Sequence, residues 1–590
     1  MAKNKIIDFI SETEVEGKPE EIEAVQPYLH ILVEDYGYPK SRILSHPQFR
    51  VKVRPSDERK EYPVDIAVFN SDNKNDDTVF MIVECKRKNR NDGLSELKDY
   101  LRFSKASIGV WFNGEEKQYI RKYEKDGTIE FVEIPNIPRY GQRIEDIGLF
   151  KRRDLKQAHN LKQTFRAIRN FLAANTVGAT RDEVLAQQLI NLIFCKIYDE
   201  RFKQPDEICD FRAGIDEYPS AVKLRILELF EKVKRKYKEV LEKNDTISLD
   251  DKSIVYVVGE LQNYALTETQ RDSIADAFET FIGHALKGAQ GQFFTPRNVI
   301  RMMVSILNPS DEDLIIDPTC GSGGFLVEAL KYIWKGLEED AKKYHWNEEN
   351  LREEKLEVAL NKIRGIDKDY FLAKVAKAYM AILGDGKSGI FCEDSLEMPS
   401  NWGEKTRIKI DENKFTVLLT NPPFGSKIPV TGREKISQYD LGFKWKCANG
   451  VWSRENILKE KEAPQVLFIE RDINLLVNRG KMAIVLPDGF FGNHNYGYIR
   501  NWLFSKGRIL AIIDLPVETF QPNTATKTSV LVFQKLVPEE IPEDYEIFMA
   551  IAETCGHDRR GNMIESDDIE KIAEKYHEWE KGQDIIGVDD

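Results

Sequence analysis

Two short segments of this sequence, each next to an apolar run, carry residues suited to hold a reactive ligand. The first is DPTCGSGG from Asp317, in which an acid ends the run LIID and glycines follow at positions 321, 323 and 324. Glycine lets the backbone approach a ligand closely, and an acid at a strand end can hold a cationic amine or hydroxyl groups. Similar glycine-rich turns bind dinucleotides or bind nothing, so this segment alone leaves the ligand open.

The second segment is NPPFG, Asn421 to Gly425, directly after FTVLLT. Two prolines fix a rigid turn without backbone donors, so the amide oxygen of Asn421 and the carbonyl of Pro422 can both face a ligand as acceptors. Two acceptors beside the ring of Phe424 suit an exocyclic amine on a planar base, because they take its hydrogens while the ring stacks on the base. A simple tight turn is the alternative, and the glycine-rich segment disfavours it.

A third group of chemically suited residues lies in the first hundred positions. Asp65 stands in PVDIAVF, and Glu84 and Lys86 form E-C-K at the end of VFMIV. Alternate residues of a strand share a face, so Glu84 and Lys86 point together while Cys85 points away. Two carboxylates can hold magnesium, and a lysine can orient or activate water beside a scissile phosphate, as in the D…(D/E)-x-K arrangement of many endonucleases. An edge-strand ion pair is the alternative for the triplet alone.

The hydrophobic pattern predicts the elements that position these residues. From residue 288 to about 540, strand-length apolar runs alternate with helical patterns, which predicts an α/β doubly wound, mostly parallel sheet that binds ligands at the carboxyl ends of its strands. Residues 151–287 have a helical period and predict an all-α domain. Residues 1–150 mix one helical stretch with short strands and predict an α+β domain, and residues 541–590 form a short tail.

Three motifs stand in one order: GQFFTP from Gly291 to Pro296, then DPTCGSGG, then NPPF. In this order they resemble the γ-class adenine-N6 DNA methyltransferases, especially the modification subunits of type I restriction-modification systems. The resemblance covers roughly residues 155–564, including GHDRRGN from Gly556. It implies a Rossmann-like domain that transfers a methyl group from S-adenosylmethionine to an adenine flipped out of DNA. The catalytic residues implied are Asn421, Pro422, Pro423 and Phe424.

The same resemblance implies positions for the cofactor. GQFFTP would contact its methionine end, and Asp317 with the glycine-rich turn would hold the amino acid part. Asp367, at the end of IRGID, would take the ribose hydroxyls, and Asp394, in FCEDSL, would reach the adenine amine; a surface acid or a helix cap is the alternative for each. The expected cofactor-binding residues are Phe293, Phe294, Thr295, Asp317, Pro318, Gly321, Ser322, Gly323, Asp367 and Asp394.

Residues 19–114, with DIAVFN, IVECK and WFNG, resemble the N-terminal nuclease domain of type I restriction subunits. The resemblance implies a PD-(D/E)xK-like fold in which Asp65 and Glu84 hold Mg²⁺, Lys86 is catalytic, and Glu21 on an upstream helix completes the site. Glu23 lies close by and competes for that role. The sequence has no G-x-x-x-x-G-K-[ST], so cleavage is expected without ATP-driven translocation. A nuclease fused to a methyltransferase resembles type IIB or IIG restriction-modification subunits.

Composition sets limits on the partners. Lys plus Arg total 86 and Asp plus Glu total 99, a formal charge of −13 over 590 residues, which would normally argue against a nucleic-acid partner. We therefore expect a separate specificity subunit to supply most contacts to double-stranded DNA, with KRKNR after Glu84 as a local basic patch. The predicted assembly is a hetero-oligomer in which the helical domain and the tail 541–590 dock this subunit.

The remaining observations concern location and alternatives. No apolar run reaches the ~18 residues of a membrane span, the N-terminus lacks a signal peptide, and seven scattered cysteines indicate reduced thiols, so a prokaryotic cytoplasmic protein is expected. One alternative is a methyltransferase subunit whose nuclease-like domain is inactive and binds DNA or partners; another is methylation of a protein glutamine or of RNA. The stretch 426–463, with interleaved Lys and Trp, either grips DNA or forms a mobile surface loop.

Overall fold

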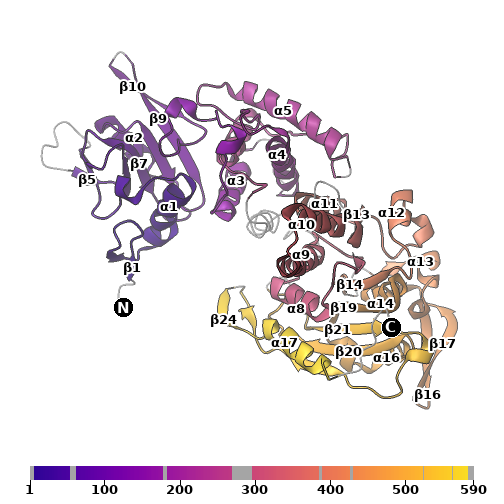
Figure 1. The fold of residues 1–590 in the computed structure, drawn as a ribbon. Coiled ribbons are helices and arrows are strands. Elements are labelled where there is room, and N and C mark those ends of the chain that lie inside the picture. The colour runs from indigo at the N-terminus through magenta and orange to yellow at the C-terminus, as the bar shows by residue number, and fades with distance from the viewer. Residues whose placement is uncertain are drawn as a thin grey trace. The chain divides into compact units, whose positions relative to one another are not determined.

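The chain folds into two compact units, Met1–Ala289 and Gln290–Asp590. This computed structural model describes residues 5–52, 61–125, 127–176, 182–238, 240–268, 295–383, 389–425, 429–521, 524–560 and 562–582 (Figure 1). The division lies close to the start expected for the α/β domain. Each unit is described by itself below.

The first unit begins with a six-stranded mixed sheet. Its order is β10 (Thr128–Glu133), β9 (Lys117–Lys125), β8 (Ile108–Phe112), β7 (Val79–Cys85), β6 (Ile66–Phe69) and β3 (Ile43–Leu44), and only β7 and β8 run parallel. The helical run η1 (Glu21–Val25), α1 (Gln26–His30) and η2 (Ile31–Asp35) packs on one face, and α2 (Leu94–Phe103) packs on the other. Two short hairpins, β1 (Lys5–Ile7) with β2 (Glu14–Glu16) and β4 (Arg50–Lys52) with β5 (Glu61–Pro63), flank it. The strands expected around Asp65 and Glu84 are therefore present.

Helices follow this sheet within the same unit, as the helical period predicted. They are α3 (Leu161–Asn175), α4 (Asp182–Phe202), α5 (Pro219–Lys236) and α6 (Asp251–Leu261). Helix α6 is joined to the sheet because Glu260 accepts hydrogen bonds from Lys117 Nζ at 2.9 Å and from Tyr119 OH at 2.7 Å. The Lys117–Glu260 pair is buried, each side chain being 2% exposed.

The second unit is built on an eight-stranded sheet. Its order is β13 (Ile390–Cys392), β12 (Ile363–Asp367), β11 (Ile315–Asp317), β14 (Phe415–Thr420), β19 (Leu476–Pro487), β21 (Thr528–Lys535), β20 (Gly507–Asp514) and β22 (Phe548–Ile551). The strands from β13 to β19 are parallel, and β21 is antiparallel to both of its neighbours. The mostly parallel sheet is thus confirmed. Because β11 and β14 are neighbours, their carboxyl ends bring Asp317 and Asn421 to one edge.

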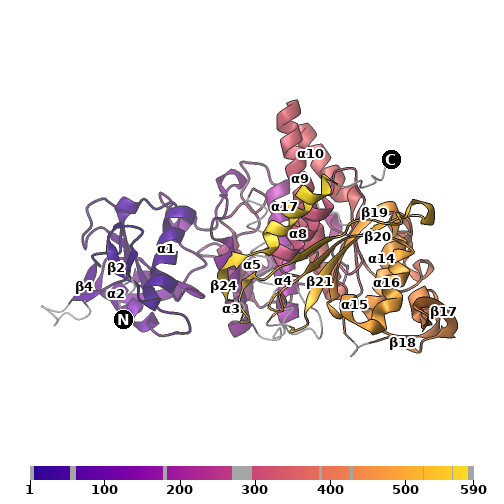
Figure 2. The same cartoon turned by 90° about the horizontal axis from the view of Figure 1, so that it is seen from below.

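Helices cover both faces of this sheet (Figure 2). On one face, α14 (Pro464–Leu475) and α16 (Gly497–Phe504) bury Val466, Ile469 and Ile499 against strand residues such as Leu418 and Ile484. On the other lie α8 (Arg297–Leu307) and α9 (Gly324–Tyr344). Further helices in the described part of this unit are α10 (Glu348–Glu357), η6 (Val358–Lys362), α11 (Tyr370–Leu383), α12 (Glu404–Lys409), α15 (Gly489–Gly492) and α17 (Ile569–Glu580).

The described part of the stretch 426–463 forms short helices and strands and is not an irregular loop. It contains β15 (Val430–Thr431), α13 (Arg433–Ser437), the hairpin β16 (Phe443–Ala448)–β17 (Val451–Leu458), and β18 (Lys461–Glu462). The rings of Trp445 and Trp452 each lie 6.0 Å from the ring of Tyr498 on α16. Both tryptophans are half-buried and pack against the core cluster that contains Tyr498.

The tail expected for subunit docking belongs to the second unit. Strand β22 pairs with β20 at the sheet edge, β23 (Cys555–His557) and β24 (Met563–Asp567) form a hairpin, and α17 packs on α8. A role in docking stays a prediction. Within the described ranges, none of the helices is both long and apolar enough to cross a membrane.

Candidate functional site

The turn that follows β14 contains a buried side-chain oxygen without a hydrogen-bond donor. Asn421 Nδ2 donates to Thr295 Oγ1 at 3.0 Å, while Asn421 Oδ1 is buried and receives no hydrogen bond from any described residue. Phe424 is half-buried, and its ring meets that of Phe520 edge to face, with centroids 6.5 Å apart. A buried acceptor without a donor is unfavourable, so this oxygen is suited to an incoming ligand donor.

Asp317 ends β11 next to this turn. Its carboxylate Oδ1 accepts from Thr319 N at 3.0 Å and from Thr420 Oγ1 at 2.8 Å, which ties the end of β11 to the end of β14. The residue is 1% exposed, and burial raises the pKa of Asp317 to about 7. A cationic ligand amine placed here would favour the ionised carboxylate.

The glycine-rich turn continues from Asp317. Gly321 and Gly323 have φ of +52° and +91°, which side chains rarely adopt, and a Cβ added at Gly323 would lie 3.3 Å from Ala376 Cβ. A Cβ at Gly321 would meet nothing within 4 Å, so this position faces the open side of the turn. Pro318 is buried and Ser322 is half-buried on the same turn.

Asp367 supports the glycine-rich turn from the end of β12. Its Oδ2 accepts from Gly321 N at 2.9 Å and its Oδ1 from Asp369 N at 2.8 Å. Burial raises the pKa of this carboxyl. Each carboxylate oxygen has a second lone pair, so Asp367 can hold the turn and still accept a ribose hydroxyl.

Asp394 is less available than the sequence suggested. Its Oδ2 lies 2.8 Å from Lys435 Nζ and its Oδ1 accepts from Leu396 N at 3.0 Å. Lys435 belongs to α13 of the inserted stretch, a contact that sequence spacing does not reveal. Of the residues expected at the methionine end of the cofactor, Phe293 and Phe294 lie outside the described residues, whereas Thr295 contacts the turn 421–424.

The first unit brings the nuclease-like residues together on β6 and β7. Asp65, immediately before β6, accepts from Cys85 N at 2.7 Å through Oδ2 and from Gln48 Nε2 at 3.4 Å through Oδ1. Glu84 on β7 is 4% exposed and is paired with Lys86, whose Nζ also lies 3.2 Å from Glu96 Oε2. Burial, followed by the negative charge of Asp65, raises the pKa of the Glu84 carboxyl. A divalent cation between the two acids would relieve this repulsion.

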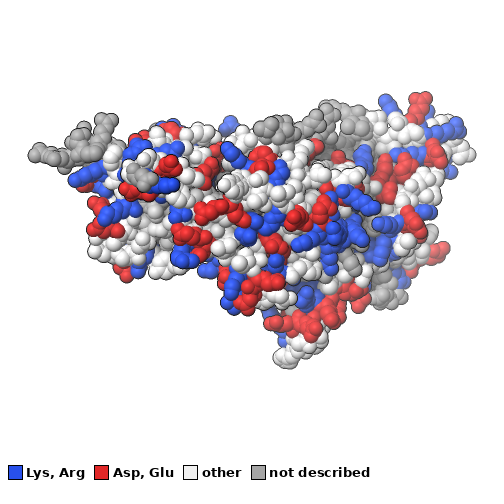
Figure 3. All heavy atoms as spheres, turned by 90° about the horizontal axis from the view of Figure 1, so that it is seen from above, with Lys and Arg blue, Asp and Glu red and all other residues white. Residues whose placement is uncertain are grey.

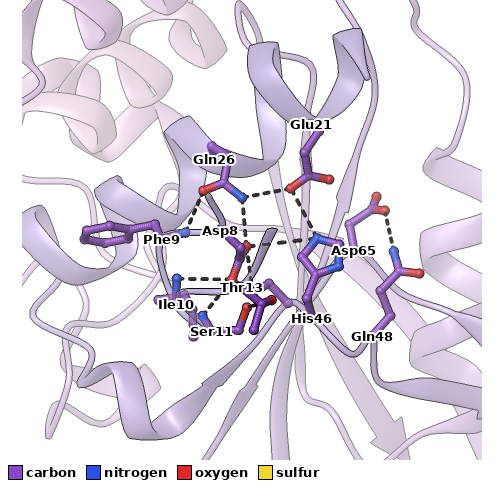
Figure 4. Close-up of polar contacts among 11 residues, drawn as sticks. Asp8, Phe9, Ile10, Ser11, Thr13, Glu21, Gln26, His46, Gln48 and Asp65 are labelled. Atoms are coloured by element: carbon purple, nitrogen blue, oxygen red, sulfur yellow. Dashed lines mark hydrogen bonds and ion pairs between the residues drawn. The ribbon is translucent and has the colours of Figure 1, made fainter. Parts of the chain in front are cut away.

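Glu21 points into a different set of contacts (Figure 4). Its Oε1 accepts from Gln26 Nε2 at 2.8 Å and lies 3.3 Å from His46 Nε2. Ligand atoms of Asp8, Glu21 and His46 all lie within 4.8 Å of one another, but Gln26 Nε2 also donates to Asp8 at 2.8 Å, so an amide donor already fills this cluster.

Glu20 and Glu23, which lie next to Glu21 in the chain, differ in what they contact. Glu23 Oε2 accepts from Lys88 N at 3.1 Å, two residues after Lys86. The negative charge of Glu20 raises the pKa of Asp65 more than that of Glu21 does. Glu20 is thus a nearby carboxylate that sequence reasoning did not include. Its one available signal was its place in the first turn of the same helical run.

The expected basic patch KRKNR is largely neutralised by acids. Lys86 pairs with Glu84 and Glu96, Lys88 Nζ lies 3.5 Å from Glu115 Oε1, and Arg90 pairs with Asp92. Basic and acidic side chains are likewise intermixed over the face drawn in Figure 3. The patch therefore offers less free positive charge than its sequence suggested.

Two family models match the chain. The model "N-6 DNA Methylase" matches residues 269–587, and "Type I restriction enzyme R protein N terminus" matches residues 19–138. The type I restriction enzyme EcoEI methylase subunit of Escherichia coli is 26% identical over 56% of this chain and 63% of its own length. The MjaVII methylase subunit of Methanocaldococcus jannaschii is 25% identical over 67% of this chain and 64% of its own length. The chain thus spans less than two thirds of each relative.

A solved chain from a study of complex assembly in a type I R-M system has a similar fold. It superposes with a TM-score of 0.50 at 19% identity, covering 72% of this chain and 84% of that one. At this identity the likeness concerns the fold alone.

Proposed function

Because this chain belongs to the N-6 DNA methylase family, we propose that it transfers a methyl group from S-adenosylmethionine to N6 of adenine in double-stranded DNA. The observation that carries the proposal is the buried Asn421 Oδ1, which has no donor among the described residues and lies in an Asn-Pro-Pro-Phe turn beside Asp317. An exocyclic amine supplies the missing hydrogen.

The residues of the site divide the reaction between them. Asp317, the glycine-rich turn and Asp367 would hold S-adenosylmethionine, which when bound supplies an electrophilic methyl group on sulfonium and requires no metal. Asn421 Oδ1 and the Pro422 carbonyl accept the two amine hydrogens, which keeps the nitrogen lone pair directed at the methyl carbon. Phe424 stacks on the flipped base. S-adenosylmethionine would supply the methyl group, and the amine nitrogen that gains it would release one proton.

The test is incubation of the full chain and its specificity partner with labelled methyl donor and unmethylated duplex DNA. We expect N6-methyladenine in the digested DNA. Label recovered in protein or in RNA instead would replace this proposal by the amide- or RNA-methylation alternative.

We also propose that the N-terminal domain cleaves unmodified DNA with Mg²⁺. The support is the grouping of Asp65, Glu84 and Lys86 at the end of β7, with Glu20 or Glu21 as a further carboxylate. One chain would then cut and methylate, as in type IIB or IIG subunits. The competing function is DNA or partner binding by an inactive domain. Cleavage by wild type but not by Asp65→Ala supports the nuclease, and equal cleavage by both rejects it.

Target reading in this proposal belongs to a separate specificity subunit within a hetero-oligomer. The support is the acidic composition and the kinship with type I methylase subunits. Copurification of this chain with the product of an adjacent specificity gene tests the assembly.

A further inference from the structure

The described residues of the segment GHDRRGN, from Gly556, have no role in the chemistry above, yet they lie in the hairpin β23–β24, which contacts two parts of the site. We propose that this hairpin positions the catalytic turn 421–424 from two sides, with Asn298 and Glu518 as the positioning residues. The inference rests on the proposed methyl transfer and adds positioning residues to it.

The first connection runs through the start of α8. Asn298 Nδ2 donates to Cys555 O at 3.0 Å and to Asp567 Oδ2 at 2.8 Å, one partner on each strand of the hairpin. Thr295, directly before this helix, accepts the hydrogen bond from Asn421 Nδ2 at 3.0 Å. The hairpin therefore fixes the helix start, and the helix start fixes which way the Asn421 amide faces.

The second connection runs through the loop after β20. His557 Nε2 lies 3.0 Å from Glu518 O, and Arg559 Nε donates to Glu518 Oε1 at 2.9 Å. Phe520 follows two residues later, is 2% exposed, and meets Phe424 edge to face. The hairpin thereby supports the ring that backs the proposed base-stacking residue.

The hairpin itself is shaped for this role at Gly556. This residue has φ of +75°, and a Cβ there would lie 2.9 Å from Asp567 Oδ2, the atom that receives Asn298. Asp567 Oδ1 also accepts from Ile569 N at 3.0 Å at the start of α17. Asp567 thus links the hairpin to both α8 and α17 through hydrogen bonds.

The connection through Asn298 is tested by exchanging the hydrogen-bond donor and acceptor between residues 298 and 567, in the full chain with its specificity partner. Asn298→Asp places two carboxylates together, and Asp567→Asn added to it restores one amide-to-carboxylate bond. We expect Asn298→Asp to lower kcat about 10- to 100-fold, since small misplacements at a reacting centre have effects of this size. The KM for S-adenosylmethionine should change by less than about 3-fold, and the double variant should recover much of kcat.

The second connection has a matched control in adjacent residues. Arg559→Ala removes the contact to Glu518 and should lower kcat, whereas Arg560→Ala, whose exposed side chain has no partner among the described residues, should not. Equal rates for these two, or no recovery in the Asn298→Asp/Asp567→Asn pair, would overturn the proposal.

Hydrogen–deuterium exchange tests the positioning role without relying on the proposed reaction. Amides of residues 415–425 should exchange faster in Asn298→Asp than in wild type and return in the double variant, whether or not methyl transfer is seen. Wild type that methylates no DNA rejects the proposed function, while unchanged exchange in Asn298→Asp rejects the positioning role.

Discussion

At the scale of single residues, the proposed methyl transfer depends most on the orientation of one amide. Asn421→Ala removes the unpaired acceptor and the donor to Thr295 while leaving the prolines of the turn in place. We expect methyl transfer to fall by about 10²–10³-fold, the usual effect of deleting one preorganised polar contact in an active site. Binding of S-adenosylmethionine, followed by calorimetry, should change little. Asn361→Ala, at an exposed asparagine, is the matched control, and an equal rate in both variants would contradict the assignment.

The buried acids of the first unit make its stability depend on pH. Burial first, then the charge of Asp65, raises the pKa of Glu84 to about 8, whereas the unfolded carboxyl titrates at about 4.3. Between these values the folded state holds a proton that the unfolded state releases, so this group makes folding less favourable as pH rises. Glu84→Gln removes this dependence. The difference between the free energy of unfolding of Glu84→Gln and that of wild type should therefore change in favour of the variant by roughly 1–3 kcal/mol from pH 5 to pH 8.5.

Urea denaturation at the two pH values measures this difference. The attraction of Lys86 is already part of the pKa of Glu84, so the informative quantity is the change with pH in the difference between the free energies of unfolding of variant and wild type. Glu96→Gln, at the half-exposed partner of Lys86, should show a nearly constant difference. A difference that stays constant for Glu84→Gln as well would mean that Glu84 is already ionised at pH 5.

At the scale of elements, the strands that carry the motifs could be predicted because their signals are local. LIID and FTVLLT are short apolar runs followed by turn residues, and they form β11 and β14. That these two strands are neighbours could not be predicted, because the order of strands in a sheet is not encoded in any local sequence pattern. The contact of Asp317 with Thr420 follows from that order.

Other parts of the site depend on contacts between distant segments. From the sequence alone, the tryptophans of the inserted stretch fit either a DNA-binding surface or a packed hairpin. Their ring contacts with Tyr498, a residue far along the chain, favour the packed hairpin. The contacts of Glu21 could not be predicted from α-helical spacing, because Glu21–Val25 is a π-helical turn whose i→i+5 bonding changes which side chains share a face. The role of the tail hairpin became visible only through Asn298, more than 250 residues earlier in the chain.

Strand β9 and helix α6 are joined by a buried ion pair that can be broken at one end. Glu260→Gln leaves Lys117 charged and buried without a carboxylate, which typically lowers the free energy of unfolding by about 3–5 kcal/mol. Glu268→Gln, at the half-exposed partner of Arg152, should cost at most about 1 kcal/mol. Denaturant unfolding of the full chain followed by a probe in the first unit compares the two. Similar losses would show that Glu260 does not hold the sheet and helix together.

At the scale of the whole molecule, the charge of −13 and the neutralised KRKNR segment limit how strongly this chain alone can bind DNA. The end of α5 is an exception, since Lys232 and Arg235 are exposed and have no ion pair among the described residues. We expect weak, sequence-independent binding of duplex DNA by the chain alone, and tight specific binding only with the specificity partner.

Fluorescence anisotropy across salt concentrations tests the part of this binding that α5 provides. If both cations contact phosphates, Lys232→Gln/Arg235→Gln should reduce the slope of log K against log salt by about 1.8, because each phosphate contact contributes roughly 0.9. Lys5→Gln/Lys105→Gln removes the same charge at lysines paired with Glu14 and Asp77 at 2.7 Å, and should reduce the slope less. An equal reduction in both double variants would mean that only net charge matters. Tight, sequence-specific binding by the unaccompanied chain would contradict the need for a separate reader.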